Sequence, residues 1–342
     1  LYQGARRRPS PEILKELDVL VFDIQDIGAR FYTYSCTLIN TLEEAAKTGL
    51  PLLVLDRPNP ITGVHVEGPM IDKDLESFIG CHSLPVRHGM TLGELAAMVN
   101  AERKLGAKLE VVKMEGWQRG DWFDSTGLRW VDPSPNMRSL TAALLYPGVA
   151  LLEYSKNYSV GRGTPAPFQQ IGANWLNGVE LAQYLNARSI PGIRVYPTRF
   201  RPEASNLANL DLEGLRFVIT ERNIFSSTQF GLELAAALLK LYPGRIDLPG
   251  NAKLIGNAKT IAALRDGIDP RTIIQSQQDD LAARLELLIS AGKFPKFEDK
   301  IRQLGSYGGG NHFGECEAVQ IADNDRARRA AEVFGLRDGC VA

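Results

Sequence analysis

The sequence predicts an α/β protein with a parallel sheet and a smaller α+β part toward its C-terminal end. Two short, continuously apolar runs at 17–24 and 51–56 are typical of strands that are covered on both faces. The segment between them, 35–48, has the apolar periodicity of a helix. After about residue 178 the pattern changes to that of an α+β fold.

The first strand–helix–strand unit has clear internal signals. Leu38 and Leu42 lie on one helical stripe of residues 35–48, and Gly49 is a plausible helix end. A crossover connection of this length joins parallel strands with right-handed topology. We therefore expect strands 17–24 and 51–56 to be parallel neighbours.

A second helix is predicted to begin at Thr91. The sequence Thr91-Leu92-Gly93-Glu94 has the form of a capping box, so we interpret Glu94 as a helix cap. The remaining predicted elements are strands at 109–114, 148–153, 193–200 and 215–222, and helices at 178–187, around 228–241 and within 257–290.

Composition excludes several classes of function. The 342 residues are 44% hydrophobic and 23% charged with a formal net charge of -1, so nothing indicates a nucleic-acid partner. No apolar run approaches the roughly 18 residues of a membrane span. The four cysteines contain no CxxC pair, so neither a disulfide framework nor a zinc site is predicted; they are Cys36, Cys81, Cys316 and Cys340. The chain begins at Leu1, and its localisation cannot be derived from the residues.

Polar loops follow both of the first two strands. Asp23, Asp26 and Arg30 follow the first strand, and Arg57 and Asn59 follow the second. Ligands of open α/β sheets bind beyond the carboxyl ends of the strands. The alternative interpretation is that the aspartates accept loop N–H bonds and pair with the arginines. Because two such loops occur together at one edge, a binding or catalytic site is favoured.

Three further polar loops are expected at the same edge. Arg87 and His88 precede the capped helix, Asn136 lies in the proline-rich loop 132–137, and Arg162 lies between two glycines that could help to hold an anion. No GxGxxG, Walker A, HExxH or GxSxG motif is present. The residues thus predict no metal site and no cofactor. Carboxylates with tyrosine, amide and arginine side chains suit a sugar that carries an acidic substituent.

Several long blocks resemble one known family. DVLVFDIQDIGARFYTY, LDRPNPITGVHVEGP, SFIGCHSLPVRHGMTLGELA, PSPNM, YPGVALLE and NYSVGRGT resemble the NamZ/YbbC-like exo-β-N-acetylmuramidases, from residue 1 to about 285. The resemblance implies a Rossmann-like domain at 1–177, whose first strands we expect to be missing, and a smaller subdomain at 178–290. It also implies an active cleft between them and a secreted or periplasmic protein.

The implied activity is removal of terminal N-acetylmuramic acid from the non-reducing ends of peptidoglycan fragments, with a muropeptide or disaccharide as substrate. Asp23 and Asp26 are the predicted catalytic carboxylates. A glutamate of the family's Pro-Glu-His-Gly motif has no counterpart here. The residues predicted to hold sugar hydroxyls, the lactyl carboxylate or a catalytic carboxylate are Gln25, Arg30, Tyr32, Arg57, Asn59, Arg87, His88, Asn136 and Arg162.

The C-terminal segment 291–342 has a different character. GGGNHFGE resembles a motif of the RtcB family of RNA ligases, which would make His312 a counterpart of a manganese ligand. The other ligands of that family have no counterpart, and one histidine does not make a metal site. Two alternatives to the muramidase therefore stay open, namely a non-catalytic module that binds cell-wall sugars and a fragment of an RNA ligase.

Overall fold

The computed structural model describes residues 7–290. The segment that resembles an RNA ligase, 291–342, lies outside the described residues. The predicted domain limits at 177 and 290 stay predictions. In the part of the chain that is described, no helix combines the length and the apolarity that a membrane span requires.

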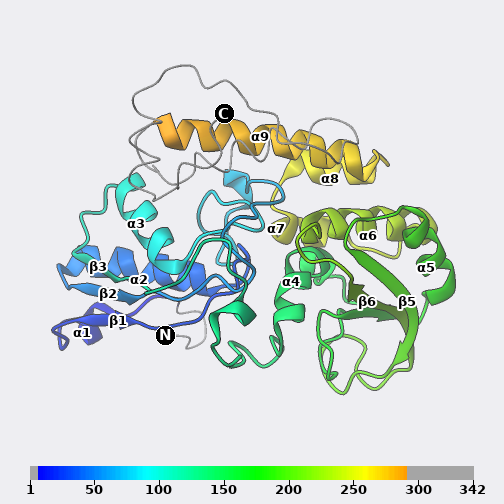
Figure 1. Cartoon of the computed structure of the whole chain (residues 1–342), viewed down its shortest axis with the longest axis horizontal. Helices are drawn as coiled ribbons and strands as arrows, with labels where there is room; N and C mark the ends of the chain where they lie inside the picture. Colours follow the sequence, from blue (N-terminus) through cyan, green and yellow to red (C-terminus); the bar gives the residue numbers. More distant parts are fainter. Residues whose placement is uncertain (1–6, 291–342) are drawn as a thin grey trace, which may run out of the picture. The chain divides into compact units, whose positions relative to one another are not determined.

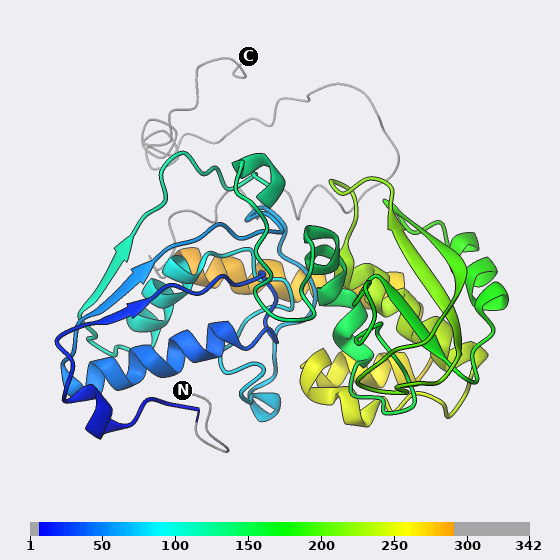
Figure 2. The same ribbon diagram turned by 90° about the horizontal axis from the view of Figure 1, so that it is seen from below.

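The first half contains a parallel sheet of three strands in the order β1-β2-β3. β1 is Leu20–Phe22, β2 is Leu52–Leu55 and β3 is Leu109–Val112. Helix α2, Tyr34–Thr48, connects β1 to β2, and α3, Leu92–Glu102, precedes β3 (Figure 1). Figure 2 shows the three strands side by side with α2 running along them. The predicted α/β class is confirmed.

Helix α2 ends and helix α3 begins at the predicted signals. α2 ends at Gly49, whose φ of 71° is the left-handed conformation that glycine adopts most easily. At the start of α3, the Thr91 hydroxyl accepts a hydrogen bond from Glu94 N, and the Glu94 carboxylate accepts one from Thr91 N. The predicted capping box is therefore confirmed.

The prediction that the first two strands are covered on both faces was wrong for β1, which has an exposed residue, whereas the residues of β2 are buried or half-buried. Phe22 and Val54 are buried, whereas Val21 is 54% and Val112 45% exposed. Val21 pairs in register with Leu53, so alternate positions leave one face of the sheet partly open within the described residues. A continuous apolar run does not reveal which face is covered, because residues of both faces are apolar.

The second half contains an antiparallel sheet in the order β4-β6-β5. β4 is Gln170–Ala173, β5 is Ile193–Phe200 and β6 is Leu212–Ile219. Strand β5 matches the prediction, β6 begins three residues earlier, and β4 was not predicted. The larger helices of this half are α5 Gly178–Ala187, α6 Ser227–Leu241, α8 Ala258–Arg265 and α9 Pro270–Ser290. The remaining short elements are α1 Pro11–Leu14, η1 Lys73–Leu75, η2 Phe123–Thr126, η4 Pro249–Asn251 and α7 Ala252–Ile255.

The predicted strand at 148–153 was wrong. This segment is the end of helix α4, Leu140–Val149, followed by the short 3₁₀ helix η3, Ala150–Leu152. The Ser139 hydroxyl caps α4 by accepting a hydrogen bond from Ala142 N. Apolar residues surround α4 on all sides, and such a helix has the same continuous apolar pattern as a buried strand.

Helices α4 and α6 approach closely at two glycines. A Cβ placed on Gly231 would lie 2.6 Å from the Cα of Gly148, and one on Gly148 would overlap the backbone of Ser227. The Ser227 hydroxyl also accepts a hydrogen bond from Gly148 N. This crossing therefore depends on the absence of side chains at both glycines.

A disulfide joins Cys36 in α2 to Cys81, and its two Cα atoms are 5.7 Å apart. The prediction that no disulfide is present was wrong. CxxC spacing detects only cysteines that are close in sequence, whereas these two are 45 positions apart and meet only in the folded chain. The bond ties the first turns of α2 to the loop that leads toward His88.

Candidate functional site

The two aspartates that follow β1 and β2 have structural partners. Asp23 Oδ1 accepts a hydrogen bond of 2.7 Å from Arg57 Nε, and the side chains of this pair are 46% and 41% exposed. Asp56 accepts hydrogen bonds from the Thr91 hydroxyl and Gly93 N at the start of α3. Burial raises the pKa of Asp56, although these hydrogen bonds act in the opposite direction. The first pair lies at the surface, and Asp56 anchors a helix.

Asp26 and His88, predicted from different loops, are neighbours in the structure. The Asp26 carboxylate accepts a 2.7 Å hydrogen bond from Gly28 N, and His88 Nε2 lies 3.4 Å from the same oxygen. His88 Nδ1 accepts a hydrogen bond from Met90 N, so a neutral His88 carries its proton on Nε2, which makes no hydrogen bond among the described residues. Asp26 Oδ1 is buried and has no hydrogen-bond partner among the described residues.

Tyr32 adds a phenol to this polar group. Burial raises the pKa of Tyr32 well above its usual value, and the nearby charge of Asp26 acts in the same direction. The phenol therefore stays protonated and can act as a hydrogen-bond donor at neutral pH. Its ring packs against Tyr34 at 4.9 Å and against Tyr146 at 5.8 Å between centroids.

Two amide side chains hold the loops of this region together. Gln25 donates hydrogen bonds to the backbone carbonyls of Asp26 and Pro58. Asn59 donates to Met90 O and accepts from Ile61 N. Gly28 has φ 82°, and a Cβ there would lie 2.4 Å from Asn59 Oδ1. Both amides thus fix the loops that carry Asp26 and His88.

Arg30 is fully buried and its terminal nitrogens are occupied. They donate to the carbonyls of Pro69, Leu84, Leu254 and Ile255 at 2.8–3.0 Å. Burial lowers the pKa of Arg30 to about 9, against an opposing effect of Asp72. The side chain therefore remains charged at neutral pH and ties three segments of the chain together.

Arg87 is also fully buried and paired. Its Nη1 lies 2.6 Å from Glu67 Oε1, and its Nη2 donates to the carbonyl of Ile61. Glu67 in turn accepts a hydrogen bond from the Ser226 hydroxyl. Burial, the largest single effect, raises the pKa of Glu67, but the charges of Arg87 and His65 and the hydrogen bonds from Ser226 and Thr228 together outweigh it, so the pKa lies below its usual value. Neither Arg30 nor Arg87 presents a terminal nitrogen to a ligand in this arrangement.

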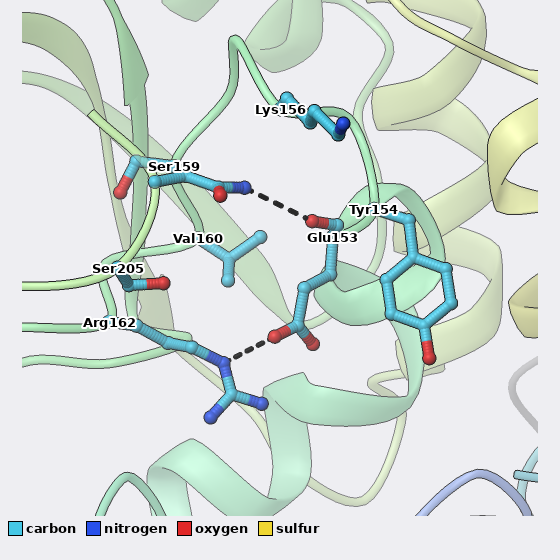
Figure 3. Close-up of a pocket in the computed structure, with 8 residues that line it drawn as sticks. Glu153, Tyr154, Lys156, Ser159, Val160, Arg162 and Ser205 are labelled. Atoms are coloured by element: carbon cyan, nitrogen blue, oxygen red, sulfur yellow. Dashed lines mark hydrogen bonds and ion pairs between the residues drawn. The ribbon is translucent and has the colours of Figure 1, made fainter.

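A pocket of about 480 Å³ lies beside η3, within the size range of small-molecule sites. Figure 3 shows Glu153 and Arg162 joined as an ion pair in the lining of this pocket, with Tyr154 and Lys156 shortly after Glu153 in the chain. Of the predicted site residues, Arg162 lines this pocket. The described lining residues are Glu153, Tyr154, Lys156, Ser159, Val160, Arg162, Ser205 and Asn206.

The guanidinium of Arg162 is held at one side only. Its Nε donates a hydrogen bond to Glu153 Oε1, and its Cζ lies 4.8 Å above the centroid of the Phe168 ring. Burial, the largest single effect, lowers the pKa of Arg162, but the charge and the hydrogen bond of Glu153, together with the nearby tyrosines, outweigh it and the net shift is upward. The two terminal nitrogens make no hydrogen bond within the described part of the chain. They can therefore bind an anion.

Aromatic rings connect the pocket to the group around Asp26. Tyr146 stacks edge-to-face with Phe168 at 4.6 Å and with Tyr32 at 5.8 Å between centroids. Burial raises the pKa of Tyr146 well above its usual value, and the charge of Glu153 adds to this shift. The contact between Tyr32 and Tyr146 thus links the surroundings of Asp26 to those of Glu153.

Sequence reasoning missed Glu153 because the segment 148–153 was assigned to a strand. The charged pattern of LLEYSKNYSVGRG, with an acid nine residues before Arg162, was the available signal. Asn136 is half-buried in the loop 132–137, and Tyr34 donates a hydrogen bond to Pro133 O in the same loop. The roles predicted for the site residues stay predictions.

Comparisons with known proteins give a consistent family. The model described as exo-beta-N-acetylmuramidase NamZ, N-terminal, matches residues 1–141, and its C-terminal counterpart matches residues 144–286. Peptidoglycan beta-N-acetylmuramidase NamZ of Bacillus subtilis (strain 168) is 42% identical over 240 residues, which is 70% of this chain. The chain spans 58% of the length of that relative.

Two solved structures from Bacteroides fragilis NCTC 9343 are similar, and both are described as DUF1343 family proteins. BF0371 has a TM-score of 0.70 and 33% identity, covering 89% of this chain and 78% of the other. BF0379 has a TM-score of 0.64 and 29% identity, covering 80% of this chain and 74% of the other.

Proposed function

Because this chain belongs to the family of NamZ exo-β-N-acetylmuramidases, we propose that it is a glycoside hydrolase of peptidoglycan fragments. It releases N-acetylmuramic acid from their non-reducing ends. The substrate is a disaccharide or muropeptide whose terminal sugar carries a lactyl carboxylate.

The observation that supports this proposal is the position of Arg162 in the pocket. Four arginines were predicted to bind the lactyl carboxylate. Arg30 and Arg87 donate to buried protein partners, and Arg57 forms an exposed ion pair with Asp23. Arg162 keeps two terminal nitrogens available beside a pocket of sugar size. A carboxylate can bind such a fork through two parallel hydrogen bonds.

Asp26 is a better candidate than Asp23 for a catalytic carboxylate. Asp26 is 6% exposed, has one oxygen without a donor among the described residues, and faces His88. Asp23 is paired at the surface. We assign Asp26 to orienting the acetamido group of the substrate or acting as a base, with His88 and Tyr32 as its polar neighbours.

A second candidate function is a sugar-binding module without catalysis. The observation that favours it is that neither Asp23 nor Asp26 lines the pocket among the described residues. Turnover separates the two functions, because a binding module holds the sugar without releasing it.

The test compares chromogenic β-N-acetylmuramic acid and β-N-acetylglucosamine substrates, using protein expressed from the complete reading frame. The sugars differ only in the lactyl group. A charge-assisted pair should favour the muramic substrate in kcat/KM by at least about tenfold. Arg162→Ala should remove this preference by lowering kcat/KM for the muramic substrate alone.

Arg129→Ala, an exchange at an exposed arginine, is the matched control and should change neither rate. Equal wild-type rates on both sugars would contradict the proposed binding of the lactyl carboxylate by Arg162. Absence of turnover on both, together with binding of N-acetylmuramic acid measured by calorimetry, would favour the binding module.

A further inference from the structure

The backbone of Glu153 is held on two sides. Glu153 N donates a hydrogen bond of 3.1 Å to Ala150 O in η3, and Asn206 Nδ2 donates to Glu153 O at 3.4 Å. The second of these bonds is drawn in Figure 3. The side chain, 16% exposed, lines the pocket from this fixed position. The backbone that carries this carboxylate is therefore fixed.

Arg162 fixes the direction of the carboxylate. Its Nε donates to Oε1 of Glu153, while the second oxygen has no donor among the residues that the structure describes. Arg162 is itself held by its packing on Phe168. One oxygen of Glu153 thus accepts a hydrogen bond from Arg162, and the other is available to a ligand.

Glu153 is the acidic side chain that lines the pocket in the described part of the chain. Other carboxylates nearby have different surroundings. Asp23 pairs with Arg57 at the surface, and Glu67 is tied to Arg87 and Ser226. Asp26 is not among the residues that line the pocket. A sugar seated beside Arg162 would meet the carboxylate of Glu153.

We propose that Glu153 is a catalytic residue that contacts the reacting sugar and stabilises the positive charge of its transition state. This assignment rests on the proposed function. Hydrolysis of a glycoside passes through an oxocarbenium-like state with positive charge on the anomeric carbon and ring oxygen. A fixed carboxylate in a partly enclosed pocket stabilises that charge more than water does, because it needs no reorientation.

The same sugar reaches both members of the ion pair. The anomeric carbon and the carbon that carries the lactyl group belong to one ring. Arg162 can therefore bind the lactyl carboxylate while Glu153 faces the reacting centre. Exchanges at the two residues should therefore have different kinetic effects. Arg162 binds the lactyl group, which only the muramic substrate carries, whereas the charge of Glu153 acts on the reacting centre of both sugars.

The first test is Glu153→Gln, which keeps the size of the side chain and its ability to accept the hydrogen bond from Arg162. We expect kcat to fall by on the order of 100-fold on both the muramic and the glucosaminyl substrates, with KM little changed. Glu110→Gln, at an exposed position of β3, is the matched control and should leave both rates unchanged.

A structural role for Glu153 would give another pattern. If the side chain only positions Arg162, Glu153→Gln should lower kcat/KM for the muramic substrate alone, as is expected for Arg162→Ala. That result, or an unchanged kcat on both sugars, would overturn the assignment. If Glu153→Gln does not fold, Glu153→Asp gives the same comparison, because the shorter side chain keeps the charge but places it farther from the sugar.

A binding experiment tests the charge without turnover. The probe is 2-acetamido-1,2-dideoxynojirimycin, whose protonated ring nitrogen carries a positive charge near the position where it develops in the reaction. We expect Glu153→Gln to weaken its binding by about 10- to 100-fold in calorimetry, with neutral N-acetylglucosamine little affected. Equal losses for both probes, or none, would overturn the proposal.

The two proposals fail differently. A wild-type protein that turns over neither sugar would contradict both the proposed function and the catalytic assignment of Glu153. A wild-type protein that is active while Glu153→Gln remains equally active would remove this assignment alone.

Discussion

His88 Nε2 lies 3.4 Å from Asp26 Oδ2, and both side chains are buried. Met90 N donates to the other ring nitrogen, so a neutral His88 carries its proton on Nε2, which lies near the carboxylate but makes no hydrogen bond among the described residues. Two residues 62 positions apart, each chosen from its own loop, thus form one polar group.

Exchanges at the two predicted catalytic aspartates should separate their roles. Asp26→Asn should lower kcat on the muramic substrate by on the order of 100-fold, because it removes a buried charge that faces His88. Asp23→Asn should act mainly on KM, because Asp23 is exposed and paired with Arg57. Steady-state kinetics of both variants measure this difference. An unaltered kcat in both variants would show that neither aspartate takes part in catalysis.

Arg30 is expected to be a stability residue. Arg30→Met would leave four buried carbonyls without their donors and should lower the free energy of unfolding by more than about 3 kcal/mol. Arg57→Met, the control at an exposed ion pair, should cost less than about 1 kcal/mol. Urea unfolding compares the two. Similar losses of unfolding free energy in the two variants would show that Arg30 does not stabilise the fold more than Arg57 does.

The contact between α4 and α6 should not accept a methyl group. Gly231→Ala places a Cβ against the backbone of Gly148 and should cost about 1–3 kcal/mol of stability. A Cβ on Gly120 meets no atom within 4 Å, so Gly120→Ala should stay within about 0.5 kcal/mol of wild type. Thermal unfolding of both variants decides this, and a neutral Gly231→Ala would mean that the helices can separate freely.

The Glu67–Arg87 pair should make stability depend on pH. The folded pKa of Glu67 lies below its usual value near 4.5, so the unfolded chain binds the proton more tightly. The pair's contribution is present above pH 4.5 and is lost as pH falls below it. The stability difference between wild type and Glu67→Gln should therefore shrink from pH 7 to pH 3.5. A constant difference, with Glu110→Gln as control, would contradict the assignment.

Reduction should destabilise the fold through the bond between Cys36 and Cys81. Their separation of 45 residues closes a loop of moderate length. Cys81→Ser or a reducing agent should lower the free energy of unfolding by about 2–4 kcal/mol. Denaturant unfolding with and without reductant measures this. The Cys81→Ser variant should show no further change on reduction, and an identical midpoint for oxidised and reduced wild type would argue against the disulfide.

Elements with local signals could be predicted from the sequence alone. Gly49 ends α2 because glycine adopts positive φ easily, and Thr91 with Glu94 caps α3 because their side chains reach nearby N–H groups. The sequence also placed Asp26 and His88 on polar loops at one edge of a parallel sheet. These features depend on residues within a few positions of each other, or on the rule that parallel strands end together.

Which polar groups are available to a ligand depends on contacts that form only in the folded chain. Arg30, Arg87 and Arg162 look alike in sequence, but the first two bond buried partners and the third keeps its terminal nitrogens beside a pocket. The same holds for Cys36 and Cys81, which meet only after folding. Availability depends on partners that are distant in the chain, and an apolar run such as 148–153 does not reveal whether helix or strand will bury it. For that reason Glu153 emerged only from the folded structure.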